Sequence, residues 1–314
     1  DVNFYSGGFS TKYGDKLSSI MDISFREGSS ENIEGQLDLN YIGFGGVLEG
    51  PIGNKGSFLF SIRKSYLDLI VKSFDIGTTV APNYSDYQWK INYNLNSSNK
   101  LSLLGIWSVD QNNPDNKTAI ENDMLFFGNQ DILIHTTGIN WQKIWGEVGY
   151  SNTSVAFTSN NFDECYYETG SQLLIRKNDS YENELKFRNV NFIKFNNNFS
   201  SVFGVEYKLL KSKYNNYFGE FTDAIGNYTP AYNQLSDFSS YKIGIFNDYT
   251  LDIFKLFTLN FGIRGDYFNY NDNLNISPRI ALTYHIDELS SIKLFGGMFY
   301  QNLPSVLLSQ TDKT

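Results

Sequence analysis

The stretch that decides the fold is YQWKINYNL, residues 87–95, in which apolar and polar side chains alternate without a break. Successive side chains of a β-strand point to opposite faces, so this period of two predicts a strand with one apolar and one polar face. The same alternation recurs over residues 33–41, 101–109, 203–209, 257–263 and 280–286. None of these apolar stripes carries a charged side chain.

The polar stripes of the same strands accept charge freely. They carry Glu34, Asp38, Lys90, Glu206, Lys208, Arg264 and Arg279. Many of these runs exceed the roughly 5–6 residues of an average strand. They match the roughly 9–11 residues that a tilted strand needs to cross a bilayer.

The connections between the predicted strands alternate between short and long. Short ones are expected at 51–56, 96–99, 144–147, 196–199, 251–255 and 287–290, and long ones at 67–85, 111–133, 160–180 and 212–236; the connection at 271–275 breaks the pattern. Tight turns at one end and long loops at the other are typical of an outer-membrane barrel. A Greek-key sandwich gives no reason for such sorting. We therefore predict an all-β, antiparallel, up-and-down transmembrane β-barrel, of which about 13 strands lie in this chain.

Composition excludes several classes of protein. The 314 residues carry a net charge of −9, which disfavours a nucleic-acid partner because phosphate binding needs a basic surface. The one cysteine, Cys165, excludes an intrachain disulfide and a cysteine-based metal site. No cofactor or metal is predicted. The first residues lack the basic and apolar regions of a signal peptide, so we interpret the chain as mature or as an internal piece.

The segment GGFSTKYGDKLSSIMDISFREG, residues 7–28, has clustered glycines, but their spacing does not fit a phosphate-binding loop. It predicts a glycine-rich turn that leads into a strand over residues 18–26. The segment resembles the end of the plug domain of TonB-dependent outer-membrane receptors. Residues 46–70 and 276–286 resemble early and middle barrel strands of that family. In the plug segment the matching positions are Tyr13, Gly14, Leu17, Ser18, Ser19, Asp22 and Ile23.

This resemblance implies a barrel of about 22 strands around a plug. It implies an outer-membrane importer of a siderophore, cobalamin or glycan, driven by the TonB–ExbB–ExbD complex, and not an enzyme. Residues 1–30 would be the end of the plug and residues 31–314 part of the barrel. The TonB-binding segment, most of the plug and the last strands would lie outside this fragment.

Two sets of candidate site residues follow. Charged side chains on the polar stripes are expected to line the transport path or contact the plug, since an Arg or Lys costs about 2–4 kcal/mol at the lipid midplane. This set is Glu34, Asp38, Arg63, Lys90, Arg264 and Arg279. The second set lies in the expected loop 160–180, where aromatic and acidic side chains suit ligand capture. It comprises Asp163, Glu164, Tyr166 and Tyr167.

Two further features concern the strands. A change of phase within residues 184–195 predicts a β-bulge. Aromatic side chains near the strand ends predict belts at the two membrane interfaces. They are Tyr41, Trp107, Trp141, Trp145, Tyr249 and Tyr267.

Other functions stay open at this point. A passive porin would have no plug, and a soluble secreted β-protein would bury its apolar stripes. A barrel-embedded lipid hydrolase would use His135 or His285, the two histidines of the chain. Residues 110–123 are rich in Asp and Asn, but a calcium loop needs a Gly that is missing, so a weak divalent-cation site is a lesser alternative.

Overall fold

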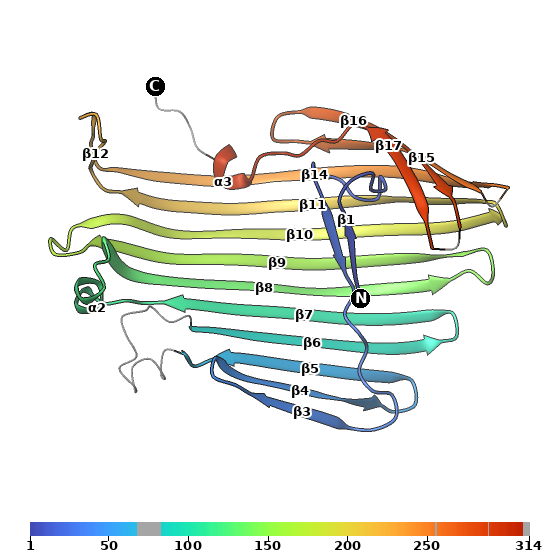
Figure 1. Ribbon diagram of the computed structural model, residues 1–314, viewed down its shortest axis with the longest axis horizontal. Coiled ribbons are helices and arrows are strands. Elements are labelled where there is room, and N and C mark those ends of the chain that lie inside the picture. Colours follow the sequence, from blue (N-terminus) through green and yellow to red (C-terminus); the bar gives the residue numbers. More distant parts are fainter. Residues whose placement is uncertain (68–82, 255, 288, 310–314) are drawn as a thin grey trace.

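A computed structural model describes residues 1–67, 83–254, 256–287 and 289–309. Within these residues, thirteen strands form one antiparallel sheet (Figure 1). They are β3 (Glu34–Leu39), β4 (Gly43–Ile52), β5 (Gly56–Ser65), β6 (Asn83–Asn96), β7 (Asn99–Asn112), β8 (Phe126–Ile144), β9 (Gly149–Glu168), β10 (Leu174–Asn196), β11 (Phe199–Phe218), β14 (Tyr232–Ile253), β15 (Phe257–Phe268), β16 (Asn273–His285) and β17 (Ser291–Gly297).

Strands that follow one another along the chain are neighbours in the sheet, from β3 at one edge to β17 at the other. Strand β11 pairs directly with β14, because β12 (Phe221–Thr222) and β13 (Tyr228–Thr229) form a separate small hairpin in their connection. This is the predicted up-and-down, all-β arrangement, and the sheet is not closed on itself. The helices α2 (Asn116–Glu121) and α3 (Ser305–Leu308) are short. Neither they nor any other helix in the described ranges could cross a membrane.

Residues 1–30 lie across one face of the sheet (Figure 1). They contain the paired strands β1 (Val2–Tyr5) and β2 (Ile20–Ile23). The prediction of a strand over residues 18–26 was wrong in extent, because the strand pairing with the four residues of β1 covers only Ile20–Ile23. We call the face that contacts residues 1–30 the inner face and the opposite one the outer face.

The apolar stripes lie on the outer face and are exposed. Among the described residues, Ile245 of β14 is 63% exposed and Ile263 of β15 is 53% exposed, although both are fully aliphatic. Their sequence neighbours Phe246 and Arg264 point to the inner face and are almost completely buried. The alternation of the sequence therefore places apolar side chains on the outer face and charged side chains on the inner face, as the period of two predicts.

The expected loop over residues 160–180 is instead largely strand. Strand β9 continues to Glu168 and β10 begins at Leu174, so that the connection contains only residues 169–173. These strand ends are polar on both faces, which hides the alternation that marks the rest of each strand. The expected loop 111–133 shrinks in the same way to residues 113–125, which hold α2. Most of the expected loop 67–85 lies outside the described residues.

The bulge predicted within residues 184–195 is absent from the middle of β10. Pairing with β11 is continuous from Arg176 to Lys194, and the register shifts only between Lys194 and Asn196 at the end of the strand. Asn189 and Asn191 occupy outer-face positions of β10, where apolar residues were expected. The two asparagines interrupt the apolar stripe, and this interruption was mistaken in the sequence for a change of phase.

Candidate functional site

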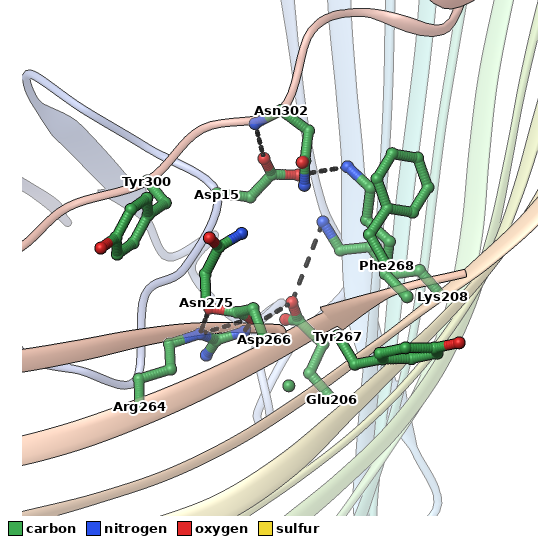
Figure 2. A pocket seen from close by; sticks show the side chains of 12 residues that line it. Asp15, Glu206, Lys208, Arg264, Asp266, Tyr267, Phe268, Asn275, Tyr300 and Asn302 are labelled. Atoms are coloured by element: carbon green, nitrogen blue, oxygen red, sulfur yellow. Dashed lines mark hydrogen bonds and ion pairs between the residues drawn. The ribbon is translucent and has the colours of Figure 1, made fainter. Parts of the chain in front are cut away.

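The candidate site is the contact between the turn at residues 8–16, which we call the N-terminal turn, and the inner face of β10, β11 and β14–β16. Figure 2 shows part of it. The turn carries several backbone carbonyl groups that no strand satisfies. Side chains of the sheet supply the missing hydrogen-bond partners, and buried polar groups require such partners.

Arg264 of β15 lies at the centre of the site and is 1% exposed. Its Nε atom donates to both carboxylate oxygens of Asp266 at 2.9 and 2.8 Å. Nη2 lies 3.5 Å from Glu206, and Nη1 donates to the Thr11 carbonyl at 3.3 Å. Figure 2 shows Arg264, Asp266 and Glu206 converging below Asp15. The buried Arg264 guanidinium thus binds two carboxylates of the sheet and one carbonyl of the N-terminal turn. It joins the turn to the inner face of the sheet.

Two glycines make room for this guanidinium. A Cβ atom on Gly14, in the N-terminal turn, would lie 2.1 Å from Arg264 Nε. A Cβ atom on Gly244, in β14, would lie 2.2 Å from Arg264 Nη2. Any side chain at either position would therefore displace Arg264 or the segment that carries the glycine.

Glu206 of β11 is surrounded by positive charge. Its carboxylate lies 3.2 Å from Lys186, 3.6 Å from Arg188, 3.8 Å from Lys208 and 3.5 Å from Arg264. The side chain is only 10% exposed, so these charges interact with little solvent screening. One carboxylate cannot neutralise four cations, which leaves this part of the inner face positive.

One carboxylate of the sheet and one of the N-terminal turn hold the turn against the sheet. Asp248 of β14 accepts hydrogen bonds from the hydroxyls of Ser10 and Thr11, both at 2.6 Å. Asp15 of the turn accepts from Lys242 Nζ and from the backbone N–H of Asn302, both at 2.8 Å. Each carboxylate thus receives two donors, which is the pattern of a strong charge-assisted contact.

The pKa of Asp15 reflects these contacts. Burial alone would raise the pKa of this carboxyl, but the hydrogen bond and charge of Lys242, together with the Asn302 N–H, outweigh burial. The pKa of Asp15 therefore lies below its usual value. The carboxylate is the form that the folded protein stabilises.

Arg279 of β16 holds the beginning of the N-terminal turn. Its guanidinium packs beside the rings of Phe9 and Phe299, 4.9 and 4.5 Å from their centroids, and the two rings contact each other edge to face. Nη1 donates to the carbonyls of Phe9, Ser10 and Tyr13 at 3.3, 2.8 and 2.9 Å. An arginine suits this position because its planar fork can stack on rings and donate several hydrogen bonds at once.

The first set of predicted residues divides into three parts. Arg264 and Arg279 belong to the site described above. Lys90 donates to the Phe25 carbonyl at 2.6 Å, and Glu34 lies 3.4 Å from the Ser29 hydroxyl. The remaining two, Arg63 and Asp38, form no hydrogen bond or ion pair with residues 1–30 in the described part of the chain. Arg63 pairs with Asp86 at 2.8 Å, and Asp38 accepts from Gln36.

Only two residues of the second predicted set come together, since the Tyr166 hydroxyl donates to Glu164 at 3.3 Å. Glu164 and Tyr166 point to the inner face, whereas Asp163 and Tyr167 alternate with them on β9 and point to the outer face. Glu164 is buried and accepts hydrogen bonds from Gln130 at 3.2 Å and Asn178 at 2.7 Å. These four residues lie in a strand rather than in the loop that the sequence suggested.

The sequence reasoning missed several members of the site. They are Asp15, Lys186, Arg188, Lys242 and Asp248. The alternation of side chains along each strand could have placed the four sheet residues on the inner face. Nothing in the sequence shows that β14 lies beside the N-terminal turn, because that contact joins residues more than two hundred positions apart.

The two histidines lie on opposite faces of the sheet. His135 is on the outer face near the rings of Trp107 and Phe157. His285 points to the inner face, where its Nε2 lies 3.1 Å from the Thr258 hydroxyl. They cannot share one catalytic site. Within the described residues, no group of three or more His, Cys, Asp or Glu side chains is placed to hold a metal ion, at residues 110–123 or elsewhere.

No protein-family model and no curated protein sequence matches the chain. Solved structures do match it. A mutant of the ferric enterobactin receptor PfeA from Pseudomonas aeruginosa is 14% identical with a TM-score of 0.68, over 96% of this chain and 48% of that one. The ferric-catecholate import receptor Fiu from Escherichia coli K12 is 12% identical with a TM-score of 0.67, over 96% of this chain and 60% of that one.

A third structure, the outer-membrane transporter YddB from Escherichia coli, is 10% identical with a TM-score of 0.64, over 96% of this chain and 48% of that one. This chain thus spans about half the length of most of the structures that it matches. At such low identity the likeness establishes the fold. The chain has the fold of a large part of an outer-membrane receptor.

Proposed function

We propose that this chain is part of an outer-membrane receptor that imports a ligand with energy delivered by the TonB–ExbB–ExbD complex. Residues 1–30 are then the end of a plug, and residues 31–314 are the adjoining part of the barrel wall. The inner face lines or approaches the transport path. The fold shared with solved outer-membrane receptors and a transporter supports this proposal.

The observation that carries the proposal is the attachment of the N-terminal turn to the inner face. Arg264, Arg279 and Asp248 bind its backbone and hydroxyls, and Lys242 binds Asp15. A segment fixed inside the wall is what a plugged receptor requires. A passive porin has no such segment, so this attachment favours the receptor over the porin.

The outer face supports insertion into the outer membrane. Its aliphatic and aromatic side chains are exposed across β3–β11 and β14–β16, and no second sheet or helical layer of the described residues covers them. Lipid would bury these side chains, as in membrane barrels. A soluble secreted β-protein would have to bury the same surface against another layer.

The ligand class stays part of the proposal. A siderophore, cobalamin or glycan would each fit the family that the sequence resembles. The lipid-hydrolase alternative gains no support, because the solved structures that share the fold are receptors and a transporter. No observation of the site favours a second function over import.

Import can be tested with the full-length protein in cells that have or lack TonB. We expect growth on a limiting nutrient to require both the protein and TonB, because transport into a plugged barrel is energised. Candidate nutrients are iron as ferric siderophores, cobalamin, and oligosaccharides. Equal uptake with and without TonB would support the porin and contradict the proposal.

A further inference from the structure

We propose that the inner face holds a binding site for a multivalent anion that carries carboxylate or phosphate groups. The site lies between the N-terminal turn and the strands β10 and β11. Its placement on the transport path rests on the proposed import function, but the binding itself does not. The anion would then be the transported ligand or a part of it.

A cavity of about 360 Å³ forms the site. It is bounded by the N-terminal turn and residues 19–21 on one side and by the inner face of β10 and β11 on the other. Its basic lining residues are Lys12, Lys16, Lys186, Arg188 and Lys208. Glu206 is the one carboxylate among the described lining residues. In a chain with a net charge of −9, such a concentration of positive charge is unusual.

The carboxylates nearby do not balance these cations. Glu206 is shared with Arg264, which also binds Asp266. Asp22 lies 4.0 Å from Lys12, at the limit of an ion pair. A surplus of cations around a cavity creates a positive potential that attracts anions.

The cations also oppose one another across the sheet. Lys186 of β10 lies directly opposite Lys208 of β11 in the register. Like charges in directly opposite positions destabilise a sheet. Glu206, which stands opposite Arg188, offsets part of this repulsion, and the charge of Asp15 also acts on Lys208. A bound anion would remove the rest of it.

Arg188 shows unused binding capacity. Its Nη2 donates to the Lys12 carbonyl at 2.6 Å, which fixes the guanidinium beside the cavity. Its Nε is buried and makes no hydrogen bond, since the nearest carboxylate oxygen, Glu206 Oε2, lies 3.6 Å away. That distance is an ion pair but too long for a hydrogen bond, so an acceptor closer to Nε would be favourable.

Lys12 indicates the same surplus of charge. Burial lowers the pKa of Lys12 and the charge of Arg188 lowers it further, and these two effects outweigh the opposing charges of Asp22 and Asp248. An anion between Lys12 and Arg188 would counter both unfavourable effects. Lysine and arginine are the side chains that bind carboxylates and phosphates most strongly.

Calorimetric titration of the purified full-length protein at low ionic strength tests this site. Citrate and pyrophosphate serve as probes, one for each anionic group. We expect saturable binding that weakens as salt is added. The variant with Lys186→Gln and Lys208→Gln should bind at least about tenfold more weakly, because it loses two charged contacts.

The variant with Lys211→Gln and Lys213→Gln is the matched control. It removes the same charge from the same part of the sheet, but both lysines are exposed on the outer face of β11. We expect its affinity for the probes to equal that of the wild type. Lys186→Arg, which keeps the charge, should also retain binding. Circular dichroism of each variant establishes that the strands have formed.

Absence of saturable binding of both probes would overturn the proposal. That result is expected if an acidic segment of the protein outside this chain occupies the cavity. Equal weakening by the inner and outer double variants would overturn it as well, because the effect would then be one of net charge. The titration needs no energised membrane, so anion binding can fail while TonB-dependent uptake holds, and the reverse.

Discussion

Lys242 and Asp15 form an ion pair of 2.8 Å that joins β14 to the N-terminal turn across 227 positions of sequence. The two side chains are 17% and 23% exposed. Residues this distant in the chain meet only if the turn lies against the wall. The pair is therefore a direct probe of the contact between residues 1–30 and the sheet.

Replacing Asp15 by Asn should destabilise this contact at neutral pH. The substitution keeps an acceptor for the Asn302 N–H but removes the charge that faces Lys242. Because hydrogen bonds between charged groups contribute about 1.5–3 kcal/mol, we expect a loss of about 1–3 kcal/mol. Thermal unfolding of the full-length protein in detergent measures it. An unchanged midpoint would mean that the pair contributes nothing to the folded state.

The same pair predicts a dependence on pH. The pKa of Asp15 is lowered in the folded protein, so its contribution is complete above the unfolded pKa of about 3.9. The contribution disappears as the pH falls below that value through the folded pKa. The stability difference between wild type and Asp15→Asn should thus be constant at pH 6–8 and shrink below about pH 4. A difference at pH 3 as large as that at neutral pH would contradict this assignment.

Removal of the Arg264 guanidinium should be far more costly than removal of an exposed one. Arg264→Met leaves Asp266 without its buried partner and Glu206 without one of its four cations, and loss of one partner of a buried ion pair typically costs about 3–5 kcal/mol. Arg63→Gln is the control, since the Arg63 side chain is 63% exposed and its pair with Asp86 should contribute less than about 1 kcal/mol. Unfolding of the full-length variants measures both values. Equal losses would show that Arg264 is not the buried hub of the site.

Much of the fold follows from the period-two stripes, because a half-buried strand must separate apolar from polar side chains. The sheet order and the two faces could be predicted from residues such as Tyr87–Leu95. The end of β9 and the start of β10 could not be predicted, because polar side chains occupy both faces near the connection at residues 169–173. The alternation of apolar and polar residues is lost there. Arg264 and Arg279 could be placed on the inner face by parity. Their contacts with Thr11 and Phe9 could not, because long-range packing leaves no local pattern.

A methyl group on Gly14 should loosen the N-terminal turn. The added Cβ would overlap the Arg264 guanidinium, which is held on several sides and cannot move freely. Overpacking of this kind typically costs about 1–3 kcal/mol. We expect Gly14→Ala to unfold at lower temperature and to expose residues 1–30 to limited proteolysis.

Gly296→Ala is the control for this prediction. Gly296 lies in β17, and a Cβ atom there would meet no neighbour within 4 Å. We expect this variant to behave as the wild type in both measurements. If Gly14→Ala were equally silent, the turn would have to lie farther from Arg264 than the structure places it.

The assignment of the two faces to lipid and water can be tested on a single strand. Ile91 of β6 is on the outer face, and Gln88 of the same strand is on the inner face. An arginine on the lipid face of a barrel costs up to about 2–4 kcal/mol near the midplane, whereas an arginine on the inner face meets water or polar groups. Ile91→Arg should therefore lower the free energy of unfolding in phospholipid vesicles by about 2 kcal/mol or more, and Gln88→Arg should change it little. If Gln88→Arg destabilised the protein more than Ile91→Arg, the inner face would be the one in contact with lipid. That result would contradict the receptor proposal.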